Sequence, residues 1–246
     1  MADRFAVVTG AGQGIGRAAA QALLADGWHV AVLGRRMAPL EETIAGQGHG
    51  VAFTADVGDR AQVEAAFAQV KERFGRLDML FNNAGRGAPA ADFDELSPED
   101  WEGVVAANLN GTFFCAQAAY RIMKNQSPKG GRIINNGSIS AHAPRPGAAA
   151  YTATKHAVTG LTKQIALDGR KHDITGSQID IGNAATPMTE RMTKGVMQPD
   201  GSMMVEPRMD VALVGKAVAH MASLPLEANI PFMTIMATKM PFLGRG

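Results

Sequence analysis

Short apolar runs rich in β-branched residues alternate along the chain with longer stretches that have helical periodicity. The pattern predicts seven strands: Phe5–Thr9, Trp28–Leu33, Val51–Thr54, Met79–Phe81, Arg132–Asn135, Ser177–Ile181 and Phe232–Met236. Apolar strands that lack polar alternation and are separated by helices are typical of a parallel sheet covered on both faces. We therefore expect an α/β fold, a doubly wound seven-stranded parallel sheet with helices on both faces. No linker-like segment interrupts the sequence, so we expect one domain over residues 1–246.

Two of the helical stretches have clear signatures. Arg60–Phe74 places apolar residues at helical spacing with charged residues between them. Ser97 followed by Pro98 predicts a helix start, because serine is a favoured N-cap and proline a favoured first helical residue. We expect a long helix over Asp100–Lys124.

The composition excludes several classes of protein. The net charge of +1 is unlike that of proteins that bind phosphate backbones, which carry clustered Lys and Arg. No apolar run approaches the ~20 residues that span a bilayer, and the N-terminus enters a strand without a secretory leader. The single cysteine, Cys115, cannot form an internal disulfide, and no Cys/His cluster has metal-ligand spacing. We therefore expect a cytoplasmic protein without nucleic-acid, membrane or metal partners.

A glycine-rich turn follows the first predicted strand and precedes an alanine-rich helix. It reads Thr9-Gly10-Ala11-Gly12-Gln13-Gly14-Ile15-Gly16-Arg17. Glycines allow a tight turn and let the backbone approach a phosphate, while the helix N-terminus offers unpaired N–H groups. The position between the first strand and the first helix indicates a Rossmann-like site for a dinucleotide cofactor.

The end of the second predicted strand indicates which dinucleotide is bound. An acid at this place usually holds the free ribose 2′-hydroxyl of NAD, but here the chain reads Gly34-Arg35-Arg36. A guanidinium can bind a 2′-phosphate through two hydrogen bonds, so we favour NADP(H) over NAD(H). The alternative is that both arginines are solvated surface charges, in which case NAD(H) is possible.

Five motifs in order and spacing resemble those of the short-chain dehydrogenase/reductase (SDR) family. They are Thr9-Gly10-x-x-x-Gly14-x-Gly16, Asn82-Asn83-Ala84-Gly85, Asn108, Ser138 and Tyr151-x-x-x-Lys155. The resemblance extends from about Phe5 to Met236.

The resemblance implies roles for individual residues. Asp56 would contact the adenine, Asn82 and Ala84 would line the adenosine side, and Thr186 would bond the nicotinamide carboxamide. The implied catalytic residues are Ser138, Tyr151, Lys155 and Asn108. The implied cofactor-binding residues are Gly10, Gln13, Gly14, Ile15, Gly16, Arg35, Arg36, Asp56, Val57, Asn83, Ala84, Gly85, Tyr151, Lys155 and Thr186.

Two departures from the family pattern matter. Ile181-Gly182 stands where the family usually has Pro-Gly, which affects the expected backbone path near the nicotinamide. The C-terminal strand lacks the common Asp-Gly-Gly ending. Its sequence and Gly34-Arg35-Arg36 resemble the NADP-dependent 3-hydroxy-acid and serine dehydrogenases more than the 3-oxoacyl-carrier-protein reductases.

The residue types fit reversible hydride transfer to a carbonyl carbon. Tyr151 and Lys155 are four apart on a helical stretch, so their side chains share a face, and a nearby ammonium favours the phenolate form of a phenol. Ser138 ends a predicted strand, where its hydroxyl can donate to a substrate oxygen. The family assigns Asn108 to a water-mediated proton relay through Lys155.

Other residues are candidates for substrate contact or for packing. His142, Arg145 and Arg86 lie next to the motif residues, and an arginine in the pocket would make a carboxylate substrate plausible. The methionine-rich segment 187–210 is the expected substrate lid, with loose packing against the core as the alternative. Simple packing roles are expected for Cys115, Trp28 and Trp101.

These observations predict an NAD(P)-dependent oxidoreductase, NADP favoured, that acts on the CH–OH group of a small secondary alcohol or on the matching ketone. A 3-oxoacyl thioester is the alternative substrate. A different alternative is a catalytically retired, NADP-binding sensor or interaction subunit. A sugar-nucleotide epimerase is disfavoured, because only about 60 residues follow Thr186. The resemblance also implies a homotetramer, or a homodimer, assembled through the helices that contain Asn108 and Tyr151.

Overall fold

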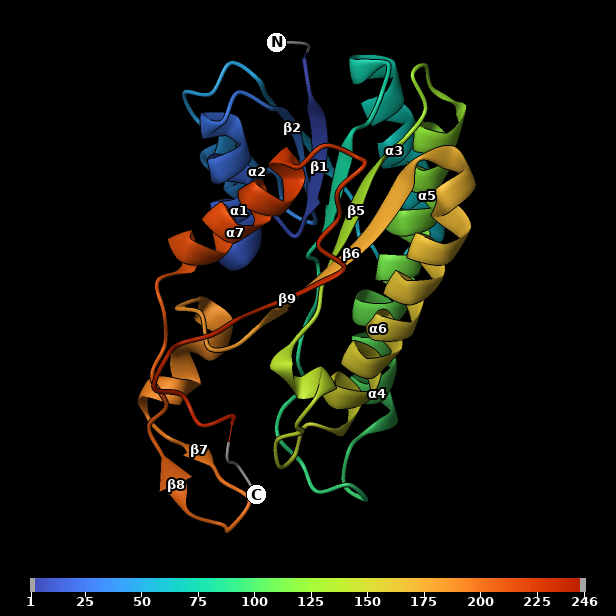
Figure 1. The fold of residues 1–246 in the computed structure, drawn as a ribbon. Helices are drawn as coiled ribbons and strands as arrows, with labels where there is room; N and C mark the ends of the chain where they lie inside the picture. Colours follow the sequence, from blue (N-terminus) through green and yellow to red (C-terminus); the bar gives the residue numbers. More distant parts are fainter. Residues whose placement is uncertain (1–2, 244–246) are drawn as a thin grey trace.

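A computed structural model describes residues 3–243 and contains one seven-stranded parallel sheet (Figure 1). The strands lie in the order β3-β2-β1-β4-β5-β6-β9. Their bounds are Phe5–Thr9 (β1), His29–Gly34 (β2), Gly50–Thr54 (β3), Met79–Asn82 (β4), Gly131–Asn136 (β5), Ile174–Ile181 (β6) and Phe232–Ile235 (β9). Residues 1–2 and 244–246 of the predicted domain lie outside the described part of the chain.

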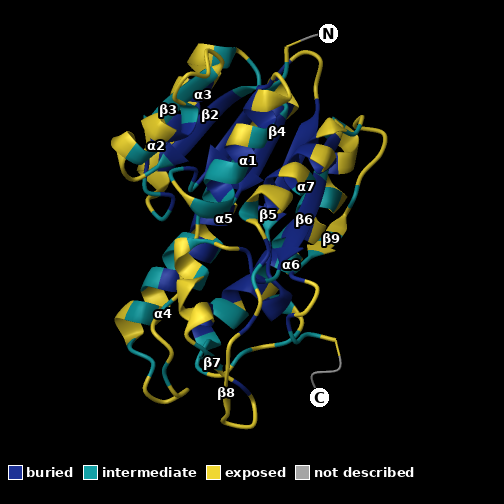
Figure 2. Cartoon of the chain, turned by 90° about the vertical axis from the view of Figure 1, so that its left-hand side faces the viewer, coloured by how far each residue is buried: buried dark blue, intermediate teal, exposed yellow. Residues whose placement is uncertain are grey.

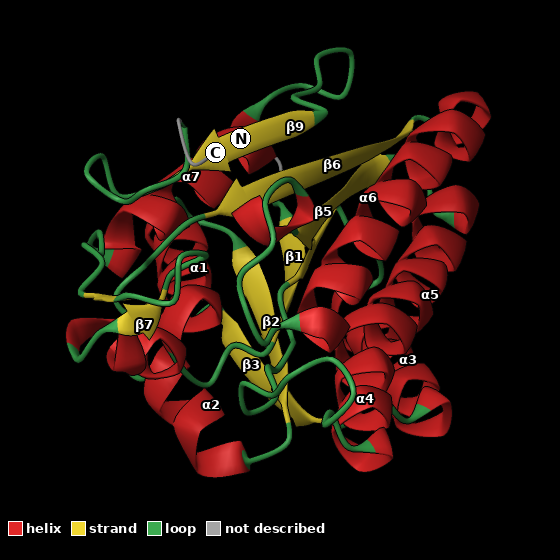
Figure 3. Cartoon of the chain, turned by 90° about the horizontal axis from the view of Figure 1, so that it is seen from below, coloured by secondary structure: helices red, strands yellow, loops and turns green. Residues whose placement is uncertain are grey.

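Helices cover both faces of the sheet, as Figure 3 shows from below. On one face lie α1 (Gly14–Ala25), α2 (Met37–Ile44) and α7 (Val211–Ser223). On the other lie α3 (Arg60–Phe74), α4 (Pro98–Val105), α5 (Gly111–Asn125) and α6 (Ala149–Gly169). The predicted fold class, a doubly wound and Rossmann-like α/β fold, is therefore confirmed.

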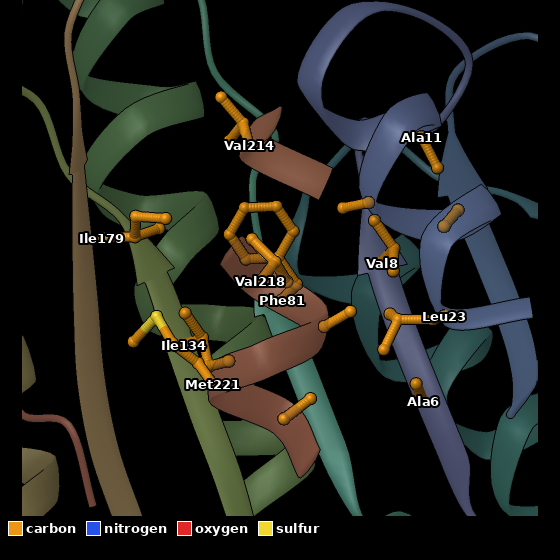
Figure 4. Close-up of a cluster of buried hydrophobic side chains, with 14 of the residues drawn as sticks. Ala6, Val8, Ala11, Leu23, Phe81, Ile134, Ile179, Val214, Val218 and Met221 are labelled. Carbon is orange, nitrogen blue, oxygen red and sulfur yellow. The ribbon is translucent and has the colours of Figure 1, made fainter. Parts of the chain in front are cut away.

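The apolar core lies in two layers, one on each side of the sheet. Neighbouring strand residues alternate between the layers: Val8 and Phe81 point toward α1 and α7 (Figure 4), whereas Val7 and Leu80 point toward α3 and α5. Both faces are covered, so apolar residues are needed on both sides of the strands and not only at alternate positions. Figure 2 shows the resulting buried sheet between helices with exposed outer faces.

The observed helix ends follow local capping chemistry. Ser97 accepts a hydrogen bond from the backbone N–H of Asp100, and Pro98 is the first residue of α4, as predicted. Asp59 caps α3 through the N–H groups of Ala61 and Gln62.

Several boundaries differ from the prediction. Trp28 is buried but precedes β2, and β6 starts at Ile174 rather than Ser177. The added part of the strand contains Gly176. A Cβ at this position would lie 2.7 Å from the Thr162 carbonyl oxygen, so only glycine allows α6 to pack this closely.

The predicted continuous α-helix over Asp100–Lys124 is also wrong in its middle. Residues Ala106–Asn110 form a π-helical turn between α4 and α5, and Asn108 lies in this turn. π-turns of this kind occur often at functional sites, because they displace a side chain from the regular helical face.

Segment 187–210 lies beyond the carboxyl ends of the strands (Figure 1). It contains the 3₁₀ helix η4 (Pro187–Thr193) and the two-stranded antiparallel hairpin β7 (Val196–Met197) and β8 (Met203–Met204). Met192 and Met209 are buried, whereas the other four methionines of the segment are exposed: Met188, Met197, Met203 and Met204. Packing against the core therefore accounts for only two of the six.

The expected packing residues fall into two groups. Cys115 and Trp28 are buried, as predicted. Trp101 is 43% exposed and lies outside the buried core, so any packing contact that it makes leaves much of its ring at the surface. None of the helices between residues 3 and 243 is long and apolar enough to cross a membrane.

Candidate active site

The sheet changes winding direction between β1 and β4, and the turns that follow these two strands are joined there by hydrogen bonds. The Thr9 hydroxyl accepts the backbone N–H groups of Asn83 (3.0 Å) and Ala84 (2.9 Å). The Asn83 side chain donates to the Thr9 carbonyl oxygen at 2.9 Å. In open α/β sheets this crevice is where ligands bind.

Close backbone contacts explain the glycines of the turn. Gly10 has φ +64°, and a Cβ there would lie 2.9 Å from the Ala84 Cα. A Cβ on Gly16 would lie 2.3 Å from the Gly10 carbonyl oxygen. Gly14 approaches Thr186, whose Cγ2 would be 3.2 Å from an added Cβ. The structure therefore brings Thr186 to the glycine turn.

The N-terminus of α1 fits the phosphate-binding role predicted for it. The N-cap residue Gln13 is exposed and makes no side-chain capping bond, and Ile15 packs partly buried against the core. The first N–H groups of a helix need an acceptor, and a diphosphate provides one. The residues present fit a dinucleotide at this turn.

Arg35 and Arg36 follow β2 and are exposed. Their guanidinium groups form no hydrogen bond or ion pair with any residue between 3 and 243. Arg17, in contrast, donates to the Gly12 carbonyl oxygen at 2.6 Å and pairs with Glu42 at 2.9 Å. Two free cations at the end of β2 fit a 2′-phosphate.

The other predicted cofactor residues lie around the same crevice. Asp56 Oδ1 accepts the N–H of Gly58 at 2.9 Å and so forms the turn after β3, and Val57 is buried there. A Cβ on Gly85 would lie 3.0 Å from Asn108 Oδ1. Asn82 is buried, and its amide donates to Thr112 and Asn135, which places it inside the protein rather than along a cofactor.

Ser138 and Tyr151 line one pocket of about 360 Å³. Ser138 follows β5, and Tyr151 lies near the start of α6. Lys155 is one turn further along α6 and is buried. Its Nζ lies 5.5 Å from the Tyr151 ring centroid and donates to the Asn136 carbonyl oxygen at 2.6 Å. The structure thus brings the predicted serine, tyrosine and lysine together.

The surroundings of Ser138 leave its hydroxyl proton available. Ser138 Oγ accepts a hydrogen bond from the backbone N–H of Ser140 at 3.0 Å. The Ser138 N–H donates to Asp180 Oδ1 at 2.9 Å. Because Oγ already accepts one bond, its own O–H can donate to a substrate oxygen.

The side chain of Asn108 is fully engaged in holding the site. Its Oδ1 accepts the Arg86 N–H at 2.8 Å, and its Nδ2 donates to the Arg86 carbonyl oxygen at 3.0 Å and to Thr154 Oγ1 at 3.3 Å. These bonds join the segment after β4 to α6. Within residues 3–243, no hydrogen bond links the Asn108 amide to Lys155.

Of the three predicted substrate contacts, only Arg145 lines the pocket. His142 is bound to Asp180 at 2.8 Å. The Arg86 guanidinium lies 3.5 Å from the Asp100 carboxylate and does not line the pocket, although the next residue, Gly87, does.

The sequence reasoning missed two buried acids that support the site. Asp180, at the end of β6, is 1% exposed and accepts bonds from Ser138, Gln178 and His142. A Cβ on Gly137 would lie 2.0 Å from Asp180 Oδ1, which explains the glycine before Ser138. An acid between two isoleucines near the end of a predicted strand, Ile179-Asp180-Ile181, is the signal that could have found it.

The second missed acid, Glu206, is 2% exposed and forms a two-bond ion pair with Arg145. Burial would raise the pKa of Glu206, but hydrogen bonds from Arg145, Asn183 and Gln198 lower it to about 2. This pair joins segment 187–210 to the loop between Ser138 and Tyr151. The two residues are 61 positions apart, so no local pattern indicates the contact.

Comparison with known proteins agrees with the geometry. The sequence profile described as "short chain dehydrogenase" matches residues 4–196. A 3β-hydroxysteroid dehydrogenase from Mediterraneibacter gnavus is 39% identical over 201 residues, 79% of this chain and 71% of the relative. A 3-oxoacyl-[acyl-carrier-protein] reductase from Synechocystis is 36% identical, over 77% of each chain.

Solved structures have the same fold. Actinorhodin polyketide ketoreductase with NADPH has a TM-score of 0.84 at 28% identity and covers 95% of this chain and 96% of its own. A 3-ketoacyl-(acyl-carrier-protein) reductase from Brucella melitensis with NADH has a TM-score of 0.83 at 25% identity, with the same coverage. Serine dehydrogenase with NADP⁺ has a TM-score of 0.86 at 24% identity and 98% coverage of both chains.

The extent of the profile match and of the identities, together with the glycine turn and the serine, tyrosine and lysine side chains, leads to one assignment. The chain belongs to the short-chain dehydrogenase/reductase family of nicotinamide-dependent oxidoreductases, which act on CH–OH groups.

Proposed function

We propose that this protein is an NADP(H)-dependent dehydrogenase/ketoreductase that interconverts a small secondary alcohol and its ketone. The observation that supports this most directly is the shared pocket of Ser138 and Tyr151, with Lys155 behind the tyrosine ring. Bound nicotinamide would supply or accept the hydride at its C4, which is the chemistry that the cofactor contributes.

The protein's own residues would bind the carbonyl oxygen of the substrate and transfer its proton. The Tyr151 hydroxyl donates a proton to the carbonyl oxygen during reduction and removes it during oxidation. Ser138 donates a hydrogen bond to the same oxygen and stabilises the charge that develops on it. Lys155, which donates to the Asn136 carbonyl oxygen, would help to orient the ribose. Asn108 would hold a water that relays protons through Lys155, since its side chain makes no direct hydrogen bond to the lysine within residues 3–243.

The cofactor would be held at the crevice between β1 and β4. The glycine turn with Gln13 and Ile15 would bind the diphosphate, and Asp56, Val57 and Asn83–Gly85 would line the adenosine side. Thr186 would bond the carboxamide, and segment 187–210 would close over the substrate as a lid. Arg35 and Arg36 would bind the 2′-phosphate, since both are exposed and free of partners within residues 3–243.

The cofactor preference is tested by calorimetric titration with NADPH and NADH. We expect NADPH to bind at least tenfold more tightly, about 1.4 kcal/mol, and Arg35→Ala to remove most of the difference. Arg60→Ala is the matched control, because Arg60 is also exposed but lies at the start of α3 and pairs with Glu64. Equal binding of NADH and NADPH to the wild type would contradict the NADP assignment.

The competing candidates make different predictions for the same protein. A retired sensor would bind NADPH but would not oxidise it, whichever carbonyl compound is added. The proposed reductase would oxidise NADPH in the presence of at least one carbonyl compound. A 3-oxoacyl thioester reductase would prefer acyl thioesters to free ketones. The observed Lys155–Tyr151 arrangement favours turnover, since a sensor has no chemical need for the lysine beside the phenol.

We also propose that the chain forms a homotetramer, or a homodimer, through α5 and α6. Phe113 on α5 and Leu167 on α6 are 44% and 55% exposed, which leaves apolar surface on both helices. Light scattering tests this, and a monomer mass at micromolar concentration would contradict it.

A further inference from the structure

The pocket that contains Ser138 and Tyr151 has an unbalanced set of charges. Two arginines, Arg145 and Arg191, line it. No aspartate or glutamate is among the described residues that line its wall. The net charge that a ligand meets therefore depends on whether each arginine has a partner elsewhere.

The charge of Arg145 is neutralised inside the protein. Glu206 accepts two hydrogen bonds from its guanidinium, and Asn183 accepts a third at 3.1 Å. The Arg145 side chain is only 12% exposed and the Glu206 side chain is fully buried. Arg145 is thus part of the pocket wall and adds little net charge to it.

Arg191 has no such partner. It lies in η4, is exposed, and its guanidinium forms no hydrogen bond or ion pair with any residue of the described range 3–243. The neighbouring acid, Glu190, pairs with Arg208 at 3.0 Å instead. A full positive charge therefore remains in the same pocket as Ser138 and Tyr151.

The rest of the wall shows which ligand would meet this charge. Leu96, Ile139, Ile181, Met188 and Met192 give the pocket an apolar lining. The glycine turn of residues 10–16 does not line this pocket, whereas Ser138 and Tyr151 do, so Arg191 shares the pocket with the residues proposed to act on the substrate. A guanidinium binds a carboxylate through two parallel hydrogen bonds, which gives both affinity and orientation.

We propose that the substrate is an oxo acid, with the matching hydroxy acid as product, and that Arg191 binds its carboxylate while the apolar wall contacts its carbon chain. This inference rests on the proposed carbonyl reduction at Ser138 and Tyr151. Arg191 would determine specificity and would take no part in the proton transfer.

Matched pairs of ketones test the proposal. NADPH oxidation is measured with 4-oxopentanoate and 5-oxohexanoate and with their methyl esters, which keep the carbon skeleton but lack the charge. We expect kcat/KM at least tenfold higher for the acids. Arg191→Ala should lower kcat/KM for the acids at least tenfold through KM, leave the esters and the Kd of NADPH unchanged, and be partly rescued by Arg191→Lys.

Lys194→Ala is the matched control. Lys194 directly follows η4 and is exposed, but it does not line the pocket, so the acid preference should persist. Esters reduced as well as acids, or an equal loss for both in Arg191→Ala, would overturn the proposal. Weaker NADPH binding in Arg191→Ala would assign the arginine to the cofactor and overturn it as well. If neither acids nor esters were reduced, the proposed reductase activity itself would fail.

Discussion

The buried ion pair between Glu206 and Arg145 gives the sharpest test of how segment 187–210 is held. Glu206→Gln keeps the size of the side chain and removes its charge. It leaves the Arg145 guanidinium, 12% exposed, without a carboxylate. Removing one partner of a buried pair is costly, because the remaining charge stays poorly solvated.

The magnitude follows from the pKa of Glu206. Burial would raise it, but the bonds from Arg145, Asn183 and Gln198 lower it from 4.5 to about 2. Each pKa unit corresponds to about 1.4 kcal/mol, so the ionised form contributes about 3 kcal/mol to folding at neutral pH. Because the folded pKa is lowered, this contribution is complete above pH ~4.5 and is lost as the pH falls toward 2.

We therefore expect Glu206→Gln to reduce the free energy of unfolding by about 3 kcal/mol at pH 7, measured by urea denaturation. The difference from the wild type should shrink as the pH is lowered below 4.5. Glu64→Gln is the control, since Glu64 is half exposed and pairs with Arg60 at the surface, and its change should stay below about 1 kcal/mol.

Hydrogen exchange distinguishes global from local opening. If the pair holds only segment 187–210, the loss appears as faster exchange of the Glu206 amide, which bonds the Met192 carbonyl oxygen, while the sheet stays protected. Unchanged urea stability together with unchanged exchange of this amide would refute the stabilising role of the pair.

Two further predictions concern Asp180 and Cys115. Asp180→Ala removes the acceptor of the Ser138 N–H and should lower kcat at least tenfold with NADPH binding unchanged. Asp180→Asn, which keeps an acceptor oxygen, should retain kcat within about threefold, and equal activity of the two variants would contradict the positioning role. Cys115 is buried, and burial raises the pKa of its thiol to about 12. The native protein should therefore not react with iodoacetamide at pH 8, whereas the urea-unfolded chain should react. Reaction of the native protein at the rate of the unfolded chain would contradict the burial of Cys115.

The sheet could be predicted from sequence because its determinants are local. Most of the strands contain a short apolar run, and burial on both faces removes the need for polar alternation. The glycine turn can also be predicted from the sequence. Gly10 and Gly16 are required by close backbone contacts within this turn and with the turn after β4. The prediction placed all seven strands with errors of a few residues at their ends.

The π-turn at Ala106–Asn110 could not be predicted in the same way. Its sequence, Ala-Ala-Asn-Leu-Asn, contains two asparagines, which weaken a helix but do not identify a π-turn. The features around it are tertiary: Asn108 is bonded to Arg86 and Thr154 from other segments, and Gly111 packs against Val57. A helical periodicity shows which face is buried but does not show where one residue is inserted into the turn.

The arginines show the same limit for the chemistry of the pocket. In the sequence, Arg145 lies between two motif residues and Arg191 lies in the expected lid, but only Arg145 is predicted to contact the substrate. The structure reverses their importance, since Arg145 pairs with the distant Glu206 while the acid beside Arg191 pairs with Arg208. The charge that a substrate meets is set by which cations lack partners, and pairing across 61 residues follows from the fold and not from the local sequence.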